Sequence, residues 1–166
     1  MPPIDWRKNA WISILCAYEV LYKEINKSMV AAGCVDLATY DALLHLEEAG
    51  SSGVDMGTLS DRVLLSISGV SRLVARLERD GLVSVCRSAE NHRVKLVRAT
   101  EKGLQARVAA WEVYRGLIDQ HVGLVIDDRE AEQVAQILGR VVPSCALVGW
   151  SGPKPQIKCQ EGQGGG

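Results

Sequence analysis

The sequence contains no phenylalanine, and aromatic residues make up only 5% of its 166 residues. No apolar run approaches the ~20 residues that a membrane-spanning helix requires, so we expect no membrane span. Residues 1–8 carry charge where the apolar part of a secretion signal would begin, which predicts a cytoplasmic protein. With 47% hydrophobic residues, the chain can still build one packed domain, with or without a dimerisation extension.

Motifs for metal binding and catalysis are also missing. The five cysteines (Cys16, Cys34, Cys86, Cys145 and Cys159) include no Cys-x-x-Cys pair. The three histidines (His45, His92 and His121) form no His-Glu-x-x-His motif, and the chain has no Gly-x-Ser-x-Gly turn. We therefore expect no catalytic residue, no metal site and no cofactor, and the cysteines are expected to be reduced.

Net charge is nearly absent as well, at −1 for the whole chain. The distribution is uneven, because residues 62–98 hold eight Lys or Arg against three acids and the remainder carries six net negative charges. Local charge, rather than total charge, governs how a surface meets phosphates. The middle of the chain is therefore the part suited to nucleic acid.

The most informative segment in this basic region is residues 66–83. Its apolar residues recur at i, i+3, i+4 and i+7, which places them on one face of a helix: Val70, Leu73, Val74 and Leu77. The other face carries small and positively charged residues: Ser71, Arg72, Ala75, Arg76 and Arg79. Gly81 follows where a glycine typically ends a helix. An ordinary solvated arginine face would explain such a helix taken alone, so its neighbours decide the interpretation.

Those neighbours predict a winged helix-turn-helix. Residues 57–65 form a short amphipathic pattern only a few positions before the arginine helix, which is the spacing of a helix-turn-helix. Residues 82–87 and 93–99 are β-branched runs that flank a polar turn and so predict a hairpin. The predicted fold class is mostly α with a small β wing, in which a winged helix-turn-helix domain is joined to a helical dimerisation region.

Four segments resemble the MarR family of bacterial transcriptional regulators. They are YDALLHLEEA (40–49), MGTLSDRV (56–63), SGVSRLVARLERDGLV (68–83) and LVRATEKG (96–103). The similarity extends in order over roughly residues 6–142. One departure lies in the wing, where Asn91 stands in place of the family's usual acidic residue two positions before Arg93. Asparagine can hydrogen-bond the turn but cannot form the ion pair.

The remaining chain is expected to be helical. Apolar stripes run through residues 6–29 and 104–125, Gly33 can end the first helix, and Asp36 and Asp127 can cap the helices that follow them. These terminal helices are more than a small winged helix needs for its own core. The predicted organisation is an N-terminal dimerisation helix (1–35), a winged domain (36–100), C-terminal dimerisation helices (101–142) and a flexible tail (143–166).

The resemblance implies a homodimer that binds a pseudo-palindromic double-stranded DNA operator as a repressor. The helix would enter the major groove and the wing the flanking minor groove. The expected DNA-binding residues are Ser68, Ser71, Arg72, Arg76 and Arg93. The family also implies a small aromatic or phenolic effector between the dimer helices and the winged domain. Core packing explains Trp11, Tyr40 and His45 as well as a ligand would, so no ligand-binding residue is assigned.

Two alternatives stay open. The first is a redox-sensing regulator of the same family, because some relatives sense peroxides through a cysteine on the first helix. Cys16 is on that helix but several residues out of register, and Cys86 lies in the predicted wing strand. The second is a winged-helix interaction module without DNA binding, which the Asn91 departure and the acidic remainder of the chain keep open.

Overall fold

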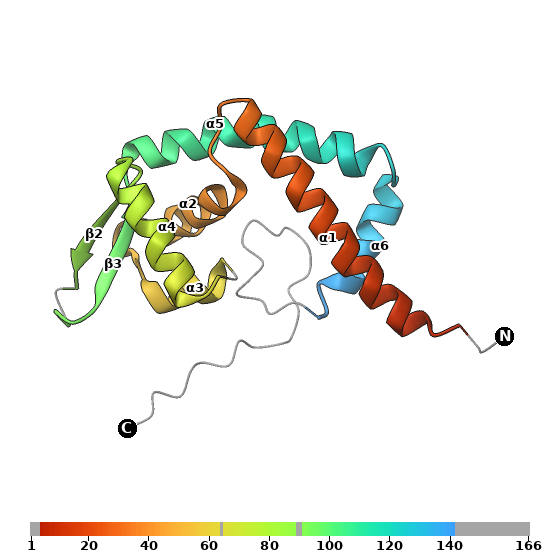
Figure 1. Ribbon diagram of the computed structural model, residues 1–166, viewed down its shortest axis with the longest axis horizontal. Coiled ribbons are helices and arrows are strands. Elements are labelled where there is room, and N and C mark those ends of the chain that lie inside the picture. Colours follow the sequence, from red (N-terminus) through yellow and green to blue (C-terminus); the bar gives the residue numbers. More distant parts are fainter. Residues whose placement is uncertain (1–3, 64, 89–90, 142–166) are drawn as a thin grey trace, which may run out of the picture.

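The computed structural model describes residues 4–63, 65–88 and 91–141, so the tail expected at 143–166 lies outside the described residues. Figure 1 shows a mostly helical chain with a small sheet at one end, which confirms the predicted fold class. The principal elements are α1 (Trp6–Ala31), α2 (Leu37–Ala49), β1 (Val54–Asp55), α3 (Met56–Arg62), α4 (Ile67–Arg79), β2 (Val83–Arg87), β3 (Lys95–Ala99), α5 (Glu101–Ile118) and α6 (Asp128–Leu138). A short 3-10 helix, Gly50–Ser52, precedes β1, and a π-helical turn, Asp119–Gly123, follows α5.

The predicted hairpin is present as two antiparallel strands within a three-stranded sheet of order β1-β3-β2. Val83 pairs with Ala99 and Arg87 with Lys95, so the two strands match along their whole length. The second strand begins at Lys95, later than predicted, because the amide of Val94 donates to the carbonyl of Asn91 and closes a turn. Strand β1 was not predicted, because its two residues are too few for an alternating pattern.

Side-chain caps fix where most helices begin. An oxygen of the preceding residue accepts a hydrogen bond from a first-turn amide. The caps predicted at Asp36 and Asp127 are confirmed, and Asp127 forms a reciprocal capping box with Glu130. The other capping residues of this kind are Asp5, Asp55, Ser66 and Thr100. Gly81, with φ of 73°, turns the chain from α4 into β2 as the sequence predicts.

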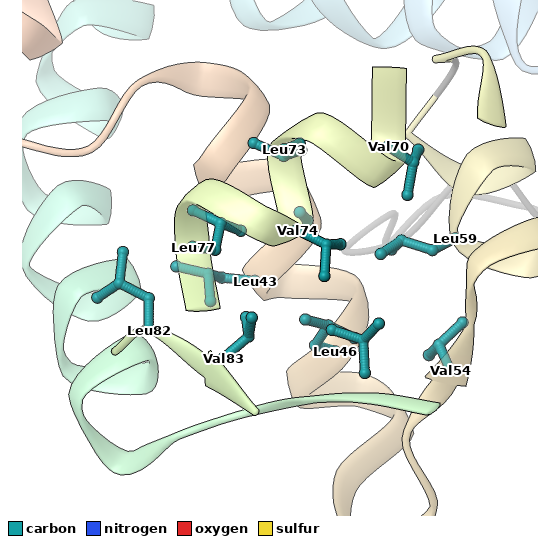
Figure 2. Packing of buried hydrophobic residues seen from close by; sticks show 12 residues of the cluster. Leu43, Leu46, Val54, Leu59, Val70, Leu73, Val74, Leu77, Leu82 and Val83 are labelled. Atoms are coloured by element: carbon teal, nitrogen blue, oxygen red, sulfur yellow. The ribbon is translucent and has the colours of Figure 1, made fainter. Parts of the chain in front are cut away.

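The main core lies beneath α4 (Figure 2). The four residues of its predicted apolar stripe, Val70, Leu73, Val74 and Leu77, are all buried. They pack with Leu43 and Leu46 of α2, Leu59 of α3 and residues of the sheet. This packing leaves the opposite face of α4 uncovered by the rest of the winged domain.

A smaller core joins α1, α2 and α5 around Met29 and Tyr40. Only the last part of α1 enters it, so the predicted stripe of this helix is only partly buried: Ile25 and Met29 are buried, whereas Trp6, Ile14, Leu15 and Tyr18 are exposed. The first half of α1 projects away from the sheet (Figure 1), and α6 has no buried residue. Within the described residues, no helix is long and apolar enough to cross a membrane.

Candidate nucleic-acid interface and adjoining pocket

The exposed face of α4 contains the first three predicted site residues. Ser68, Ser71 and Arg72 are exposed, as is Arg79, the last residue of α4. The hydroxyl of Ser66 caps the helix through the amide of Gly69 and lies 3.1 Å from the hydroxyl of Ser68. Within the described part of the chain, Arg72 has no ion-pair partner, so its guanidinium is available to a ligand.

Arg76 behaves differently from Arg72. Its Nη1 lies 2.7 Å from Oδ2 of Asp36, and its Nη2 donates to the hydroxyl of Thr39 at 3.0 Å. Partial burial alone would raise the pKa of Asp36, but hydrogen bonds from Arg76 and Thr39 and the charge of Arg76 lower it. In this structure Arg76 therefore ties α4 to the first turn of α2.

The wing places the fifth predicted residue, Arg93, on the surface beside the hairpin turn. The backbone amide of Arg93 donates to Oδ1 of Asn91 at 3.1 Å, so the asparagine does hydrogen-bond the turn as expected. Arg93 and Lys95 also line a shallow hollow with Asp55, Met56 and Gly57 at the start of α3. Arg72 and Arg93 thus lie on separate elements of the winged domain, α4 and the hairpin.

A second hollow lies between the winged domain and the long helices. It is a cavity of about 280 Å³ with lining residues from four helices: Tyr18 and Tyr22 of α1, Asp41, Leu44 and His45 of α2, Arg62 of α3, and Tyr114 of α5. His45 is 5% exposed, and burial, followed by the charge of Arg62, lowers its pKa. A neutral imidazole therefore faces this cavity at neutral pH.

Of the three residues weighed for effector binding, only His45 lines this cavity. Trp11 is 60% exposed on the projecting half of α1. Tyr40 is buried and packs edge-on against Tyr114, with ring centroids 5.2 Å apart. Asp41 was not among the predicted residues, although it lies four residues before His45 and so shares its helix face.

Helix α2, which lines the cavity, makes polar contacts with both α1 and α4. Oδ1 of Asn26 on α1 accepts the backbone amide of Leu37 at 2.9 Å, at the first residue of α2. Asp36, the residue before it, caps α2 and pairs with Arg76 on α4. A continuous set of polar contacts therefore joins α1, α2 and α4.

Among the described residues, no group of three or more His, Cys, Asp or Glu side chains is placed to hold a metal ion. Cys16 is exposed on α1, whereas Cys34 and Cys86 are partly buried. These three thiols are free within the described chain. The arrangement of α3, α4 and the hairpin defines a winged helix-turn-helix protein.

Comparison with known proteins shows similarity to one family over the middle of the chain. Residues 35–94 match the model of the MarR family. The HTH-type transcriptional repressor IacR of Pseudomonas putida is 34% identical over 86 residues, which are 52% of this chain and 50% of that protein. This chain thus spans about half the length of the curated relative it matches. The central part of the chain is therefore similar to the MarR family.

Solved structures show the same architecture over most of the chain. The transcriptional regulator BldR of Sulfolobus solfataricus superposes with a TM-score of 0.72 at 27% identity, covering 84% of this chain and 99% of that one. CouR of Rhodococcus jostii RHA1, solved with p-coumaroyl-CoA bound, has a TM-score of 0.64 at 23% identity, covering 85% of this chain and 95% of that one. The second likeness concerns the fold alone.

Proposed function

We propose that this protein is a sequence-specific DNA-binding transcriptional regulator, acting as a ligand-responsive repressor and a homodimer. The observation that carries the proposal is the uncovered face of α4, where Ser68, Ser71 and Arg72 are exposed, together with the exposed basic residues of the wing. A recognition helix reads base edges in the major groove with side chains of this kind. The match of residues 35–94 to the MarR family model supports the same function.

The proposed roles of the basic residues differ. Arg72 is long enough to form a bidentate contact with a guanine edge, which carries sequence information. Arg93, at the wing, would meet phosphates or the flanking minor groove and carry little base information. Arg76 is held by Asp36 and Thr39, so we assign it to the orientation of α4 in the DNA-free protein.

A homodimer is proposed from the surfaces that the single chain leaves uncovered. The first half of α1 exposes Trp6, Trp11 and Tyr18, each more than half exposed, and α6 exposes Val134 and Ile137. Monomeric proteins rarely expose contiguous apolar surface on this scale. A second copy of the chain would cover it and present two α4 helices to successive major grooves, about 10 bp apart.

The cavity between α1, α2, α3 and α5 is the proposed effector site. It lies where α2 contacts both the long helices and the recognition helix, through Leu37 and Asp36 respectively. A small aromatic ligand that displaced α2 would therefore move α4 through the Asp36–Arg76 pair. Only a differential affinity of the ligand for the two positions of α4 can weaken DNA binding.

Replacing Arg72 with alanine tests the DNA-reading role. Because Arg72 is exposed and has no ion pair in the described chain, folding should be unaffected, whereas affinity for a selected operator should fall by ~1–3 kcal/mol. The operator would first be selected from random duplexes, and binding would be measured by fluorescence anisotropy on the operator and on a scrambled duplex. We expect a much smaller loss on the scrambled duplex.

Arg93→Ala is the matched control in the same experiment. It removes one exposed arginine too, but it should weaken binding to both duplexes nearly equally and lower the salt slope by about one unit. If Arg72→Ala bound the operator with wild-type affinity, the base-reading role proposed for α4 would be wrong. If neither duplex bound wild-type protein, the interaction module without DNA binding would be the better description.

A second test concerns the Asp36–Arg76 pair. Asparagine caps helices as well as aspartate does, so Asp36→Asn should keep the start of α2 and lose only the ion pair. The pair is partly exposed, so the stability loss should be at most about 1 kcal/mol. Releasing Arg76 adds a free cation to α4, and DNA affinity and salt slope should both increase, the slope by up to about one unit.

Glu78→Gln is the control for this release. It removes the same charge from the exposed surface of α4 without an ion pair to Arg76. Anisotropy titrations at two salt concentrations compare the variants, and urea unfolding measures stability. An equal gain in both variants would mean that net charge, and not the release of Arg76, is responsible.

A further inference from the structure

The cavity beside α2 contains a carboxylate that its surroundings do not neutralise. Within the described chain, Asp41 has no hydrogen-bond or ion-pair partner, although it lines the cavity and is partly buried. Burial raises the pKa of Asp41 to about 6, and no neighbouring cation lowers it. At neutral pH most molecules therefore hold an unpaired negative charge at this point, which is costly unless a ligand supplies the partner.

Tyrosine rings surround this carboxylate. Tyr18, Tyr22 and Tyr114 line the same cavity, and the rings of Tyr18 and Tyr22 lie 5.5 Å apart. Burial, and then the charge of Asp41 among other groups, raises the pKa of Tyr114, and Asp41 also contributes to the raised pKa of Tyr22. Asp41 is therefore close to both rings. Tyrosine faces attract cations through the ring quadrupole, so rings and carboxylate favour the same kind of ligand group.

The other polar groups of the cavity are associated with a different part of its lining. Arg62 acts on His45, whose pKa burial and this cation lower, whereas Arg62 has no such effect on Asp41. Nδ1 of His45 is buried without a hydrogen-bond partner in the described chain. The cavity thus offers an unpaired carboxylate at Asp41 and, one helical turn further along α2, the polar groups of His45 and Arg62.

We propose that this cavity binds a small aromatic amine, whose protonated nitrogen pairs with Asp41 against the rings of Tyr22 and Tyr114. The inference rests on the proposed ligand response and deepens it, because it names the chemical class of the effector. The volume of about 280 Å³ suits a ligand with one or two rings. An aromatic carboxylate would instead place like charge beside Asp41.

Three probes that share a phenyl ring and a two-carbon linker separate the classes. They are 2-phenylethylamine, which is a cation, 2-phenylethanol, which is neutral, and 3-phenylpropionate, which is an anion. Binding to the full chain without DNA, measured by calorimetry at neutral pH, should follow the order amine, alcohol, carboxylate. The amine should exceed the alcohol by about tenfold, the ratio that 1.4 kcal/mol of differential interaction gives.

The pH dependence gives a second measurement on the unmodified protein. The cation binds the ionised form of Asp41, so its affinity should be constant well above pH 6 and fall by about tenfold at pH 5, where most of Asp41 is protonated. Protonation of His45 would add to this fall. Affinity for 3-phenylpropionate should change in the opposite direction over the same range.

Asp41→Asn should abolish the preference for the amine over the alcohol and leave only the pH dependence due to His45. Asp61→Asn, an exposed α3 residue outside the cavity lining, is the control and should keep the preference. The proposal is overturned if the amine binds no better than the alcohol, if it does not bind at all, or if Asp41→Asn retains the wild-type preference.

Measurements of operator binding distinguish failure of the amine class from failure of the proposed ligand response. If the amine binds through Asp41 and leaves DNA affinity unchanged, the ligand class stands and the ligand response fails. If an aromatic anion releases the operator and Asp41→Asn responds as the wild type does, the response stands and the amine class is overturned.

Discussion

Replacing Trp11 with glutamate is expected to convert the proposed dimer into folded monomers that have lost most of their operator affinity. Trp11 is 60% exposed in the single chain, so the winged domain gains little from it. In a dimer its indole would be covered by the partner, and burying the exposed 60% of this side chain is worth about 2–4 kcal/mol per copy by area. Because the proposed dimer is symmetric, the substitution is present in both subunits, and each glutamate places a charge in an apolar contact.

Sedimentation velocity measures this change directly, and circular dichroism reports whether the helices persist. Lys27 is exposed on the same helix, beyond its apolar half. The control Lys27→Glu should therefore leave both the dimer and operator binding intact. Operator affinity of the Trp11→Glu monomer should fall by at least tenfold, because two linked half-site contacts become independent ones. A Trp11→Glu protein that still sediments as a dimer would exclude the first half of α1 from the interface.

The fold was predictable where a local pattern specified it. The apolar period of α4 identified its buried face, and Asp36 and Asp127 marked helix starts through short-range capping. The strand β1 was missed because two residues make no pattern, and it exists only because β3 offers it a free edge. The apolar pattern of α1 predicted a face that packs against another element, but in the single chain the first half of that face stays exposed.

The candidate site was predictable to the extent that it depends on one helix. Exposure of Ser68, Ser71 and Arg72 follows from the period of α4 alone. Arg76 and Asp36 are forty positions apart in the sequence. No local spacing could therefore show that Arg76, unlike Arg72, already has an ion-pair partner. Asp41 and the tyrosines come from three helices, and their proximity depends on how α1 and α5 cross α2.

Gly103→Ala is expected to be strongly destabilising, because it lies where α5 packs against the winged domain. In an exposed helix, Gly→Ala normally stabilises by about 0.5–1 kcal/mol. At Gly103, however, a Cβ would lie 2.1 Å from the carbonyl oxygen of Leu82 and 3.0 Å from the side chain of Leu43. To relieve this clash α5 must move away from β2, and the hydrogen bond from the Thr100 amide to the same Leu82 oxygen would break. Overpacking against backbone and loss of that bond together should cost ~3 kcal/mol or more.

Gly116→Ala is the matched control, because it changes the same residue type in the same helix with nothing within 4 Å of the added Cβ. It should raise the free energy of unfolding by about 0.5–1 kcal/mol, through the helix propensity of alanine. Urea unfolding followed by circular dichroism gives both values on one scale. The expected signs are opposite, so equal effects of the two substitutions would show that α5 does not approach the carbonyl of Leu82 this closely. A stable Gly103→Ala protein would likewise mean that the start of α5 can shift without disturbing β2, and the wing would then be free to reorient relative to α4.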